Sequence, residues 1–505
     1  MINPPLFLEK LTANLVPFFA RKVDSEIIWC ASNVIDSEEL QENCSYLIDP
    51  GSNSPSRIFH AERYGGSGLQ RNGGGARCGL FGQYQIKGIG ANPLVGDGTD
   101  WSHGSGALGV SEAIYETVWS EILDELLPYG AVKVQAVLLT NSYLSISSKN
   151  SKQSSRRALL VREPVVRPAH FERAPYFRPQ MAFAGQLMHD ARRVRAVISQ
   201  LPACLPTPQA GFSPEAYADS RIYCIEGLSE LAQRLAWQMA FCRTRFLKVT
   251  TSPSNISIDG KLLDFNGLGC LFPSNYCYDF SYQLRLKEMM KEPAILRRGL
   301  SNLCLYLGKY LFDPTFTQIA CQQINQSFEQ AFQSACYHGY LSLLGITIDS
   351  VSRASVPDVF INLVESFLQL LENRRYELFH SLQDGRNLSA LERLVKQLYR
   401  ETTDEKFQND SYFRQLQLCL KAARPLLNQN STELERIALA RLQPRASLCK
   451  LQMFKEINHL IDLYSNDLPS LQQAVSAMVI KKQTFAREAL GSHVHRNKNY
   501  DATRQ

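Results

Sequence analysis

The clearest apolar periodicity of the chain lies in residues 111–127, SEAIYETVWSEILDELL. Four apolar residues recur there at every fourth position and share one face of a predicted helix: Ile114, Val118, Ile122 and Leu126. Apolar runs predict strands at 131–140 (AVKVQAVLLT), 158–166 (ALLVREPVV) and 83–89 (QYQIKGI). Residues 141–157 are rich in Ser and Lys and are expected to form an exposed loop. Together these segments predict a small sheet that carries one helix.

The pattern changes along the chain and divides it into four parts. Residues 1–54 are expected to be mostly helical, and residues 55–178 hold the predicted sheet. Residues 179–390 are predicted to form long amphipathic helices. One interruption at 252–272, SPSNISIDGKLLDFNGLGCLF, alternates apolar and polar residues around an Asp-Gly turn and predicts a β-hairpin. Residues 391–505 are predicted to be a helical C-terminal extension that ends in a basic tail.

The composition is that of an ordinary globular protein. With 505 residues the chain is too long for one compact core, and its 45% hydrophobic and 20% charged residues argue against disorder. The net charge of +6 fits an anionic small molecule and gives no reason to expect nucleic acid. We find no apolar run of about 18 residues, so no membrane span is predicted. The 13 cysteines form no CxxC pair, which argues against a disulfide framework and for the reducing cytoplasm.

The segment RNGGGARCGLFGQYQIKGIG at 71–90 suggests phosphate binding. Its glycines leave the backbone open to a ligand, and Arg77 and Lys87 supply positive charge; the alternative is a plain glycine-rich loop. A helix with two glutamates follows, and the predicted hairpin further on contains an Asn and an Asp-Phe-Asn sequence. Protein kinases have these parts in the same order, because the phosphates of ATP need fixed cations and a divalent metal.

The sequence also resembles a specific family, the SelO proteins, which are protein adenylyltransferases with a pseudokinase fold. Several fragments carry the resemblance in the family's order over about residues 57–390: AERYGGSG, RNGGGARCG, YQIKGIGANPLVGDG, LVREPVVRPAHFE, AWQMAFC and SNISIDGKLLDFNGLG. The resemblance implies an α+β, protein-kinase-like fold of two lobes, with a β-rich N-lobe and a helical C-lobe. It also implies that AMP, not phosphate, is transferred from ATP to a peptide or protein acceptor.

The resemblance further implies which residues form the site. Those expected to contact the nucleotide are Gly74, Arg77, Lys87, Asp97, Gly98, Arg162, Arg167 and Asp264. Asn255 and Asp264 are expected to coordinate Mg²⁺, or Mn²⁺ in its place, and with Lys87 they form the implied catalytic set. A helix glutamate is expected to pair with Lys87, and Glu112 is preferred to Glu116. The plain alternatives are a solvated lysine, surface arginines, a turn aspartate and an exposed helix charge.

One departure from the family pattern concerns the catalytic base. Ser254 stands where the family has an aspartate directly before the metal-binding asparagine, and Asp259 lies too near the hairpin turn to replace it. A hydroxyl acceptor must lose a proton, whereas a carboxylate acceptor is already anionic at neutral pH. We therefore expect the acceptor to be a carboxylate, which is activated as an acyl-AMP.

A narrower resemblance, to the MchC/MceJ proteins of siderophore-microcin gene clusters, points the same way. Those proteins act with a small acyltransferase-like partner to join the C-terminal serine carboxylate of a peptide to a glucosylated catecholate siderophore. This resemblance implies a peptide carboxylate as acceptor, a role in microcin maturation and a complex with such a partner. The alternative is a catalytically degenerate pseudokinase scaffold that stabilises or positions a partner enzyme, and ordinary γ-phosphoryl transfer is a third hypothesis.

Overall fold

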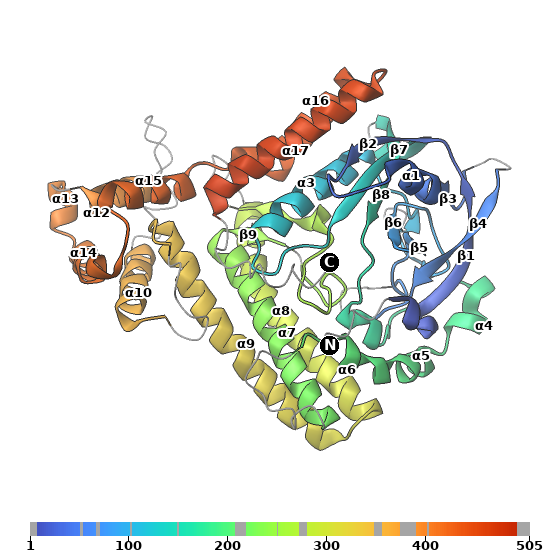
Figure 1. The fold of residues 1–505 in the computed structure, drawn as a ribbon, viewed down its shortest axis with the longest axis horizontal. Coiled ribbons are helices and arrows are strands. Elements are labelled where there is room, and N and C mark those ends of the chain that lie inside the picture. Colours follow the sequence, from blue (N-terminus) through green and yellow to red (C-terminus); the bar gives the residue numbers. More distant parts are fainter. Residues whose placement is uncertain are drawn as a thin grey trace.

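The computed structural model of the chain describes residues 8–50, 54–66, 71–100, 104–148, 151–207, 219–249, 251–271, 280–347, 356–373, 390–400 and 403–491. The structure is mixed α+β, as predicted. An eight-stranded antiparallel sheet is built from residues 15–162, and the C-terminal half of the chain is mostly helical. Figure 1 shows the sheet at one side of the molecule, with the long helices extending away from it.

Eight strands form the main sheet, and each is antiparallel to its neighbours. Their order across the sheet is β2-β7-β8-β6-β5-β4-β1-β3. The strands are β1 (Leu15–Lys22), β2 (Ser25–Cys30), β3 (Tyr46–Leu47), β4 (Ser56–Glu62), β5 (Cys78–Phe81), β6 (Tyr84–Lys87), β7 (Val134–Ser148) and β8 (Ser151–Arg162). The predicted strands are confirmed as β6, β7 and β8, which are adjacent in the sheet.

The central strands are buried on both faces, which explains why their sequences are nearly all apolar. Along β8, Leu160 belongs to the apolar cluster that includes helix α3 (Val110–Leu126), whereas Leu159 and Val161 belong to a second cluster on the opposite face. Helix α1 (Ser37–Cys44) contributes Leu40 to that second cluster. The helix predicted at 111–127 is confirmed as α3, and it packs on β7 and β8.

The prediction that residues 1–54 are mostly helical is wrong, because this segment supplies β1, β2 and β3. Val16, Phe18 and Ala20 are buried and alternate with exposed residues, a period of two that is typical of a strand. Phe19 lies among the exposed positions at 65% exposure, so the paired phenylalanines concealed the alternation. Among the described residues of this segment, only α1 is an α-helix.

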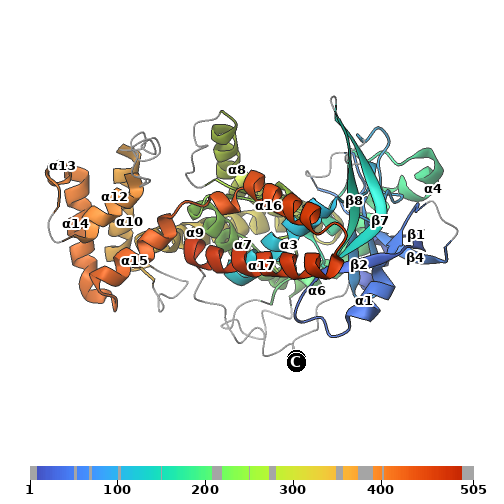
Figure 2. The same ribbon diagram turned by 90° about the horizontal axis from the view of Figure 1, so that it is seen from above.

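The loop predicted at 141–157 is instead part of a long β-hairpin. β7 and β8 stay paired from Val134 and Arg162 out to Ser148 and Ser151. Figure 2 shows the hairpin projecting away from the body of the molecule. Its outer part is solvated, since Tyr143 is 64% exposed, so serines and lysines can occupy a strand held by its backbone hydrogen bonds. Polar composition therefore gave no sign of a strand.

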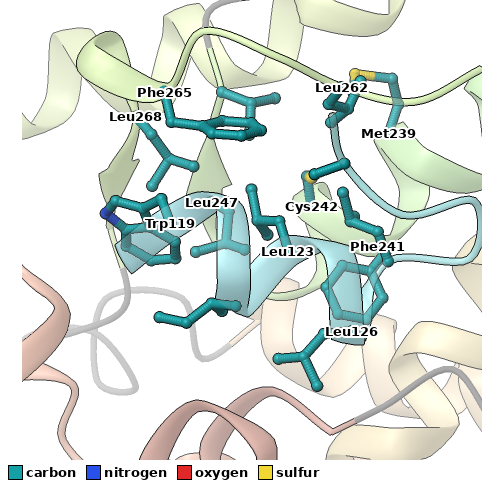
Figure 3. Packing of buried hydrophobic residues seen from close by; sticks show 14 of the residues in the cluster. Trp119, Leu123, Leu126, Met239, Phe241, Cys242, Leu247, Leu262, Phe265 and Leu268 are labelled. Atoms are coloured by element: carbon teal, nitrogen blue, oxygen red, sulfur yellow. The ribbon is translucent and has the colours of Figure 1, made fainter. Parts of the chain in front are cut away.

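Three long helices form the centre of the helical half: α7 (Ser220–Thr244), α8 (Phe280–Tyr310) and α9 (Pro314–Leu343). α7 packs on both α8 and α9. Figure 3 shows that Phe241 and Met239 of α7, Leu123 of α3 and Leu262 lie in one apolar core. This core joins the helical half to the helix that covers the sheet. The short helices before α7 are α4 (Ala184–Leu187), α5 (Asp190–Val197) and α6 (Leu201–Cys204).

The C-terminal helices form two groups. The first lies at the end of the molecule far from the sheet (Figures 1 and 2) and comprises α10 (Asp358–Asn373), α12 (Ala390–Tyr399), α13 (Glu405–Gln408), α14 (Ser411–Ala423) and α15 (Ser431–Leu442). α10 packs on α14, so this group crosses the boundary expected at 390. The second group, α16 (Lys450–Leu463) and α17 (Leu468–Leu490), returns to the sheet and packs on α3. The described residues of the extension are helical, as predicted.

Two further properties of the described residues concern membranes and disulfide bonds. None of their helices is long and apolar enough to cross a membrane. Every cysteine among them is a free thiol, in keeping with the prediction that the cysteines form no disulfide framework.

Candidate active site

A cavity of about 870 Å³ is lined by residues of both the sheet and the helical half. This volume lies within the range of small-molecule sites. Segment 71–78, residues 98–100 and the strand residues Lys87 and Arg162 come from the sheet side, and residues 251–255, Asp264 and α8 come from the helical side. Most of the predicted site residues line it: Gly74, Arg77, Lys87, Gly98, Arg162, Arg167, Asn255 and Asp264.

Lys87 is the most constrained cation of the cavity. Its side chain is only 1% exposed, and its Nζ lies 2.5 Å from Oε2 of Glu116 and 2.8 Å from Oδ1 of Asp264. A buried ammonium group is stable only when carboxylates compensate its lost hydration. These two carboxylates come from α3 and from the hairpin segment. Lys87 on β6 therefore links the sheet to α3 and to the helical half of the molecule.

The structure corrects the preferred partner of Lys87 from Glu112 to Glu116. Both glutamates lie on α3, one helical turn apart. Glu116 is buried against β6, whereas Glu112 is exposed in the first turn and its charge acts on Lys450 of α16. Oε1 of Glu116 also accepts a hydrogen bond from Arg162 at 3.2 Å. One glutamate therefore holds two cations of the cavity.

Asn255 and Asp264 are brought side by side by the predicted hairpin, which forms a chain reversal around one β-bridge. Ile256 bridges Leu262, and the backbone N–H of Leu263 donates to the carbonyl oxygen of Asn255 at 3.1 Å. Gly260 turns the chain with φ +97°, a conformation that favours glycine. The reversal places both Asn255 and Asp264 in the cavity lining.

Asp264 is an ionised carboxylate in a strained backbone conformation. Its φ of 65° lies in the left-handed region, which costs free energy for a residue with a side chain. Burial raises the pKa of its carboxyl, but the charges of Lys87 and the arginines beside it outweigh burial and hold the pKa well below its usual range. Its side chain is 29% exposed and so remains open to a ligand in the cavity.

Arg162 and Arg167 are aimed into the cavity by a glutamine that the sequence did not single out. Oε1 of Gln85 accepts from Nε of Arg162 at 2.5 Å and from Nη2 of Arg167 at 3.4 Å, while its amide donates to Glu62. Gln85 is fully buried on β6, two residues before Lys87 and therefore on the same face of the strand. That spacing was a usable signal, because a polar residue at a strand position facing a lysine needs a polar partner.

Arg167 also contacts the loop that carries Ser254. Its Nη1 donates to the carbonyl oxygen of Ser254 at 2.6 Å, and its guanidinium carbon lies 4.8 Å from the centre of the Tyr64 ring. Tyr64, like Arg71, Ser252 and Arg298, lines the cavity without having been predicted. Most of these unpredicted lining residues lie in segments that reach the cavity only through tertiary packing.

At Gly74 the glycine-rich segment packs against the backbone of Glu62, the last residue of β4. Gly74 has φ +142°, and a Cβ atom there would lie 2.1 Å from the carbonyl oxygen of Glu62, so no side chain fits. The Arg77 side chain makes no hydrogen bond or ion pair with any residue that the structure describes, and the charge of Asp264 acts on it at the cavity. Gly98 lines the cavity, but Asp97 is exposed and lies outside the lining.

Ser254 and Asp259 lie as the sequence analysis expected. Oγ of Ser254 is 2.7 Å from Oγ of Ser252, and both serines line the cavity. Asp259 hydrogen-bonds with Ser257 at the turn and does not line the cavity. Among the described lining residues there is no histidine, and the carboxylates are Asp100 and Asp264 alone.

The charges and donors of the cavity fit a polyphosphate with Mg²⁺. Six cationic side chains line the cavity: Arg71, Arg77, Lys87, Arg162, Arg167 and Arg298. The described residues contain no cluster of three or more His, Cys, Asp or Glu side chains that could hold a metal. Mg²⁺ does not need such a cluster, since it is commonly held by one or two carboxylates together with phosphates and water. The oxygens of Asp264 and Asn255 fit that mode of binding.

No protein-family model and no curated protein matches the chain.

Proposed function

We propose that the chain is a Mg²⁺- and ATP-dependent adenylyltransferase with a kinase-like fold of the SelO type, and that its acceptor is a carboxylate. The observation that carries the proposal is the contact of Lys87 with both Glu116 and Asp264 at the wall of a cationic cavity. An ion pair between a strand lysine and a helix glutamate, beside a metal-binding aspartate, is the arrangement that positions ATP in kinases.

The lining residues have separate roles in this proposal. Lys87, Arg162 and Arg167 bind phosphate oxygens, and Gly74 and Gly75 line the same cavity. Asp264 and Asn255 hold Mg²⁺, which neutralises phosphate charge while the leaving group departs. Two arginines so deep in the cavity favour a nucleotide whose β- and γ-phosphates point inward. The α-phosphate then faces the acceptor, and AMP is transferred.

The lining favours a carboxylate over a hydroxyl as acceptor. A hydroxyl must lose its proton to a nearby base, but Asp264 is paired with Lys87 and Asp100 is exposed to solvent. A carboxylate needs no base. A peptide carboxylate activated in this way, in a complex with an acyltransferase-like partner, is the role that we propose in microcin maturation.

The function is tested with ATP labelled on the α- or the γ-phosphate, incubated with Mg²⁺ and a carboxylate acceptor. AMP transfer predicts incorporation of the α-label, release of pyrophosphate and no incorporation of the γ-label. Lys87→Ala and Asp264→Ala should each abolish the signal. Incorporation of the γ-label would show phosphoryl transfer instead.

A scaffold that binds nucleotide without catalysis is the second candidate, and the serine pair in place of a base favours it. The retained ion pairs around Lys87 argue for nucleotide binding in both cases. A scaffold predicts a rise in melting temperature with Mg²⁺ and ATP but no label transfer to any acceptor. An unchanged melting temperature with ATP would indicate a scaffold that binds no nucleotide.

A further inference from the structure

One cation of the cavity lining has no hydrogen-bond or ion-pair partner among the described residues. Arg298 lies on α8 and lines the cavity together with Ile295, one turn earlier on the same helix. Arg298 makes no hydrogen bond or ion pair with any residue that the structure describes. The neighbouring Arg297, in contrast, forms an ion pair with Glu329 of α9. Of these two adjacent arginines, Arg297 pairs with a neighbouring helix and Arg298 lines the cavity.

Close packing fixes α8 beside the loop that contains Ser252, Pro253 and Ser254. At Gly299 a Cβ atom would lie 2.6 Å from Cγ of Pro253, so the helix touches the loop where no side chain intervenes. Arg298 is the residue before this contact, and Ser254 is the residue after Pro253. The arginine and the hydroxyls of Ser252 and Ser254 therefore belong to the same part of the wall.

This part of the wall is built to receive an anion. It offers a guanidinium group and two hydroxyls, whereas the lining carboxylates are Asp264, which is paired with Lys87, and the exposed Asp100. Arginine binds carboxylates through two parallel N–H donors, and serine hydroxyls can donate to the remaining lone pairs. Lys87, Arg162 and Arg167, the proposed phosphate ligands, are engaged with Glu116, Asp264 and Gln85. Arg298 has no such partner among the described residues and is available to a second ligand.

We propose that Arg298 binds the carboxylate of the acceptor and holds it for attack on the α-phosphorus of ATP. The proposal rests on the proposed function and names the acceptor subsite of that same cavity. In the step, a carboxylate oxygen forms a bond to the α-phosphorus, and the bond from that phosphorus to the β-phosphate oxygen breaks. Pyrophosphate leaves with its electron pair, an acyl-AMP forms, and no proton is transferred.

The test uses the full chain with Mg²⁺, ATP and two pools of N-acetylated hexapeptides that differ only at the C-terminus. One pool ends in a free carboxylate and contains no Asp or Glu, and the other is the same pool as C-terminal amides. The readout is exchange of labelled pyrophosphate into ATP, which reports reversible carboxyl activation. The variants are Arg298→Gln and, as the matched control, Arg297→Gln, and the affinity for Mg-ATP is measured for both.

We expect exchange with the free-carboxylate pool and none with the amides. Arg298→Gln should lower exchange at subsaturating peptide about tenfold and leave the affinity for ATP unchanged, a loss of about 1.4 kcal/mol. Arg297→Gln should behave as the unmodified chain. Equal exchange by the two variants overturns the subsite, and so does ATP binding without exchange on either pool.

Two further outcomes separate this inference from the function on which it rests. Weaker ATP binding by Arg298→Gln in the absence of peptide would make Arg298 a nucleotide ligand, and α-label on the amide pool would make the acceptor a hydroxyl. Both overturn the subsite but retain adenylyl transfer. A chain that binds no ATP overturns the proposed function itself.

Discussion

Lys87 shows how single residues define the site. A fully buried lysine loses its hydration, and two carboxylates from distant parts of the chain compensate for that loss. Glu116 shares its oxygens between Lys87 and Arg162, and Asp264 lies across from it. Each of these charges therefore depends on the position of the others.

The choice between the two helix glutamates gives the first prediction. In Glu116→Gln, Lys87 keeps Asp264 as its charged partner and neutralises the carboxylate that should hold Mg²⁺. We expect Mg-ATP binding to weaken about tenfold or more. Glu112→Gln, one turn away and exposed, should leave the affinity near that of the unmodified chain. Calorimetric titration measures both, and equal loss in the two variants would contradict the assigned pair.

Gln85 gives the second prediction. Gln85→Leu removes the acceptor shared by Arg162 and Arg167, so the two guanidinium groups repel each other without a bridge. We expect ATP to bind at least about fivefold more weakly, while AMP, which lacks the terminal phosphates, loses less affinity. Gln83→Leu is the control, since the side chain of Gln83 is exposed and hydrogen-bonds with Tyr84. An equal loss for ATP and AMP would argue against this positioning role.

A buried carboxyl outside the cavity lining predicts a pH dependence of stability. Glu172 is 2% exposed, one of its oxygens has no hydrogen-bond partner among the described residues, and burial raises its pKa from 4.5 to about 8. The folded state therefore binds this proton more tightly than the unfolded chain, and stability is lost as the pH rises from about 4.5 through about 8.

Glu172→Gln should remove this dependence. Its free energy of unfolding should match that of the unmodified chain near pH 5 and exceed it by about 1 kcal/mol or more near pH 9. Urea unfolding at both values measures the difference. The exposed Glu372→Gln serves as the control and should follow the unmodified chain throughout. A constant difference between Glu172→Gln and the unmodified chain would show that Glu172 is ionised in the fold.

Among the elements, α3 is held between the sheet and the C-terminal helices. Nζ of Lys450, at the start of α16, donates to the carbonyl oxygen of Asn266 at 2.5 Å. The amide of Asn266 in turn donates to Glu116 at 2.8 Å. The Phe454 ring packs on Tyr115 of α3 with 5.1 Å between ring centres. The C-terminal helices thus reach the ion pair at Lys87 through two residues.

Phe454→Ala tests whether α16 supports the site. The lost ring contact should destabilise the docking of α16 by about 1–3 kcal/mol, because Phe454 is only partly buried. Through Asn266 and Glu116, ATP affinity should fall severalfold. Leu451→Ala, on the same helix and 62% exposed, should change stability by less than about 0.5 kcal/mol. Unchanged ATP affinity in a destabilised Phe454→Ala would uncouple α16 from the cavity.

Some helices and strands were predictable from the sequence, and others were not. The periodicity of α3 and the apolar runs of β6, β7 and β8 predicted these elements correctly, because both faces of the strands and one face of the helix are buried. β1 and the outer part of the β7–β8 hairpin were missed, since Phe19 is exposed and the hairpin is polar. Neither feature follows from local composition, because solvent exposure there is decided by the assembled sheet.

The site was predictable where a motif fixed the spacing. Asn255 and Asp264 lie close together because a turn at Gly260 folds the chain after it back onto the chain before it. The partner of Lys87 was not predictable, because Glu112 and Glu116 lie one turn apart and only packing on β6 distinguishes them. Gln85 could have been found from its place two residues before Lys87 on the same strand face, whereas Arg298 has no motif that indicates its position at the cavity.

For the whole molecule, the cavity contains more cations than carboxylates. A net charge of +6 over 505 residues is small, yet six cations and two carboxylates line a single cavity. The sheet supplies Lys87 and Arg162, and the helical half supplies Asp264 and Arg298. A ligand that spans the cavity therefore contacts both parts of the molecule and should stabilise them together.

Calorimetric titration of Mg-ATP into the full chain and into Lys87→Ala tests the nucleotide site most directly. We predict one molecule of Mg-ATP bound per chain, and no measurable binding to Lys87→Ala although its circular dichroism shows the same fold. Absence of binding by the unmodified chain, or equal binding by Lys87→Ala, would contradict the assignment of this cavity as a nucleotide site.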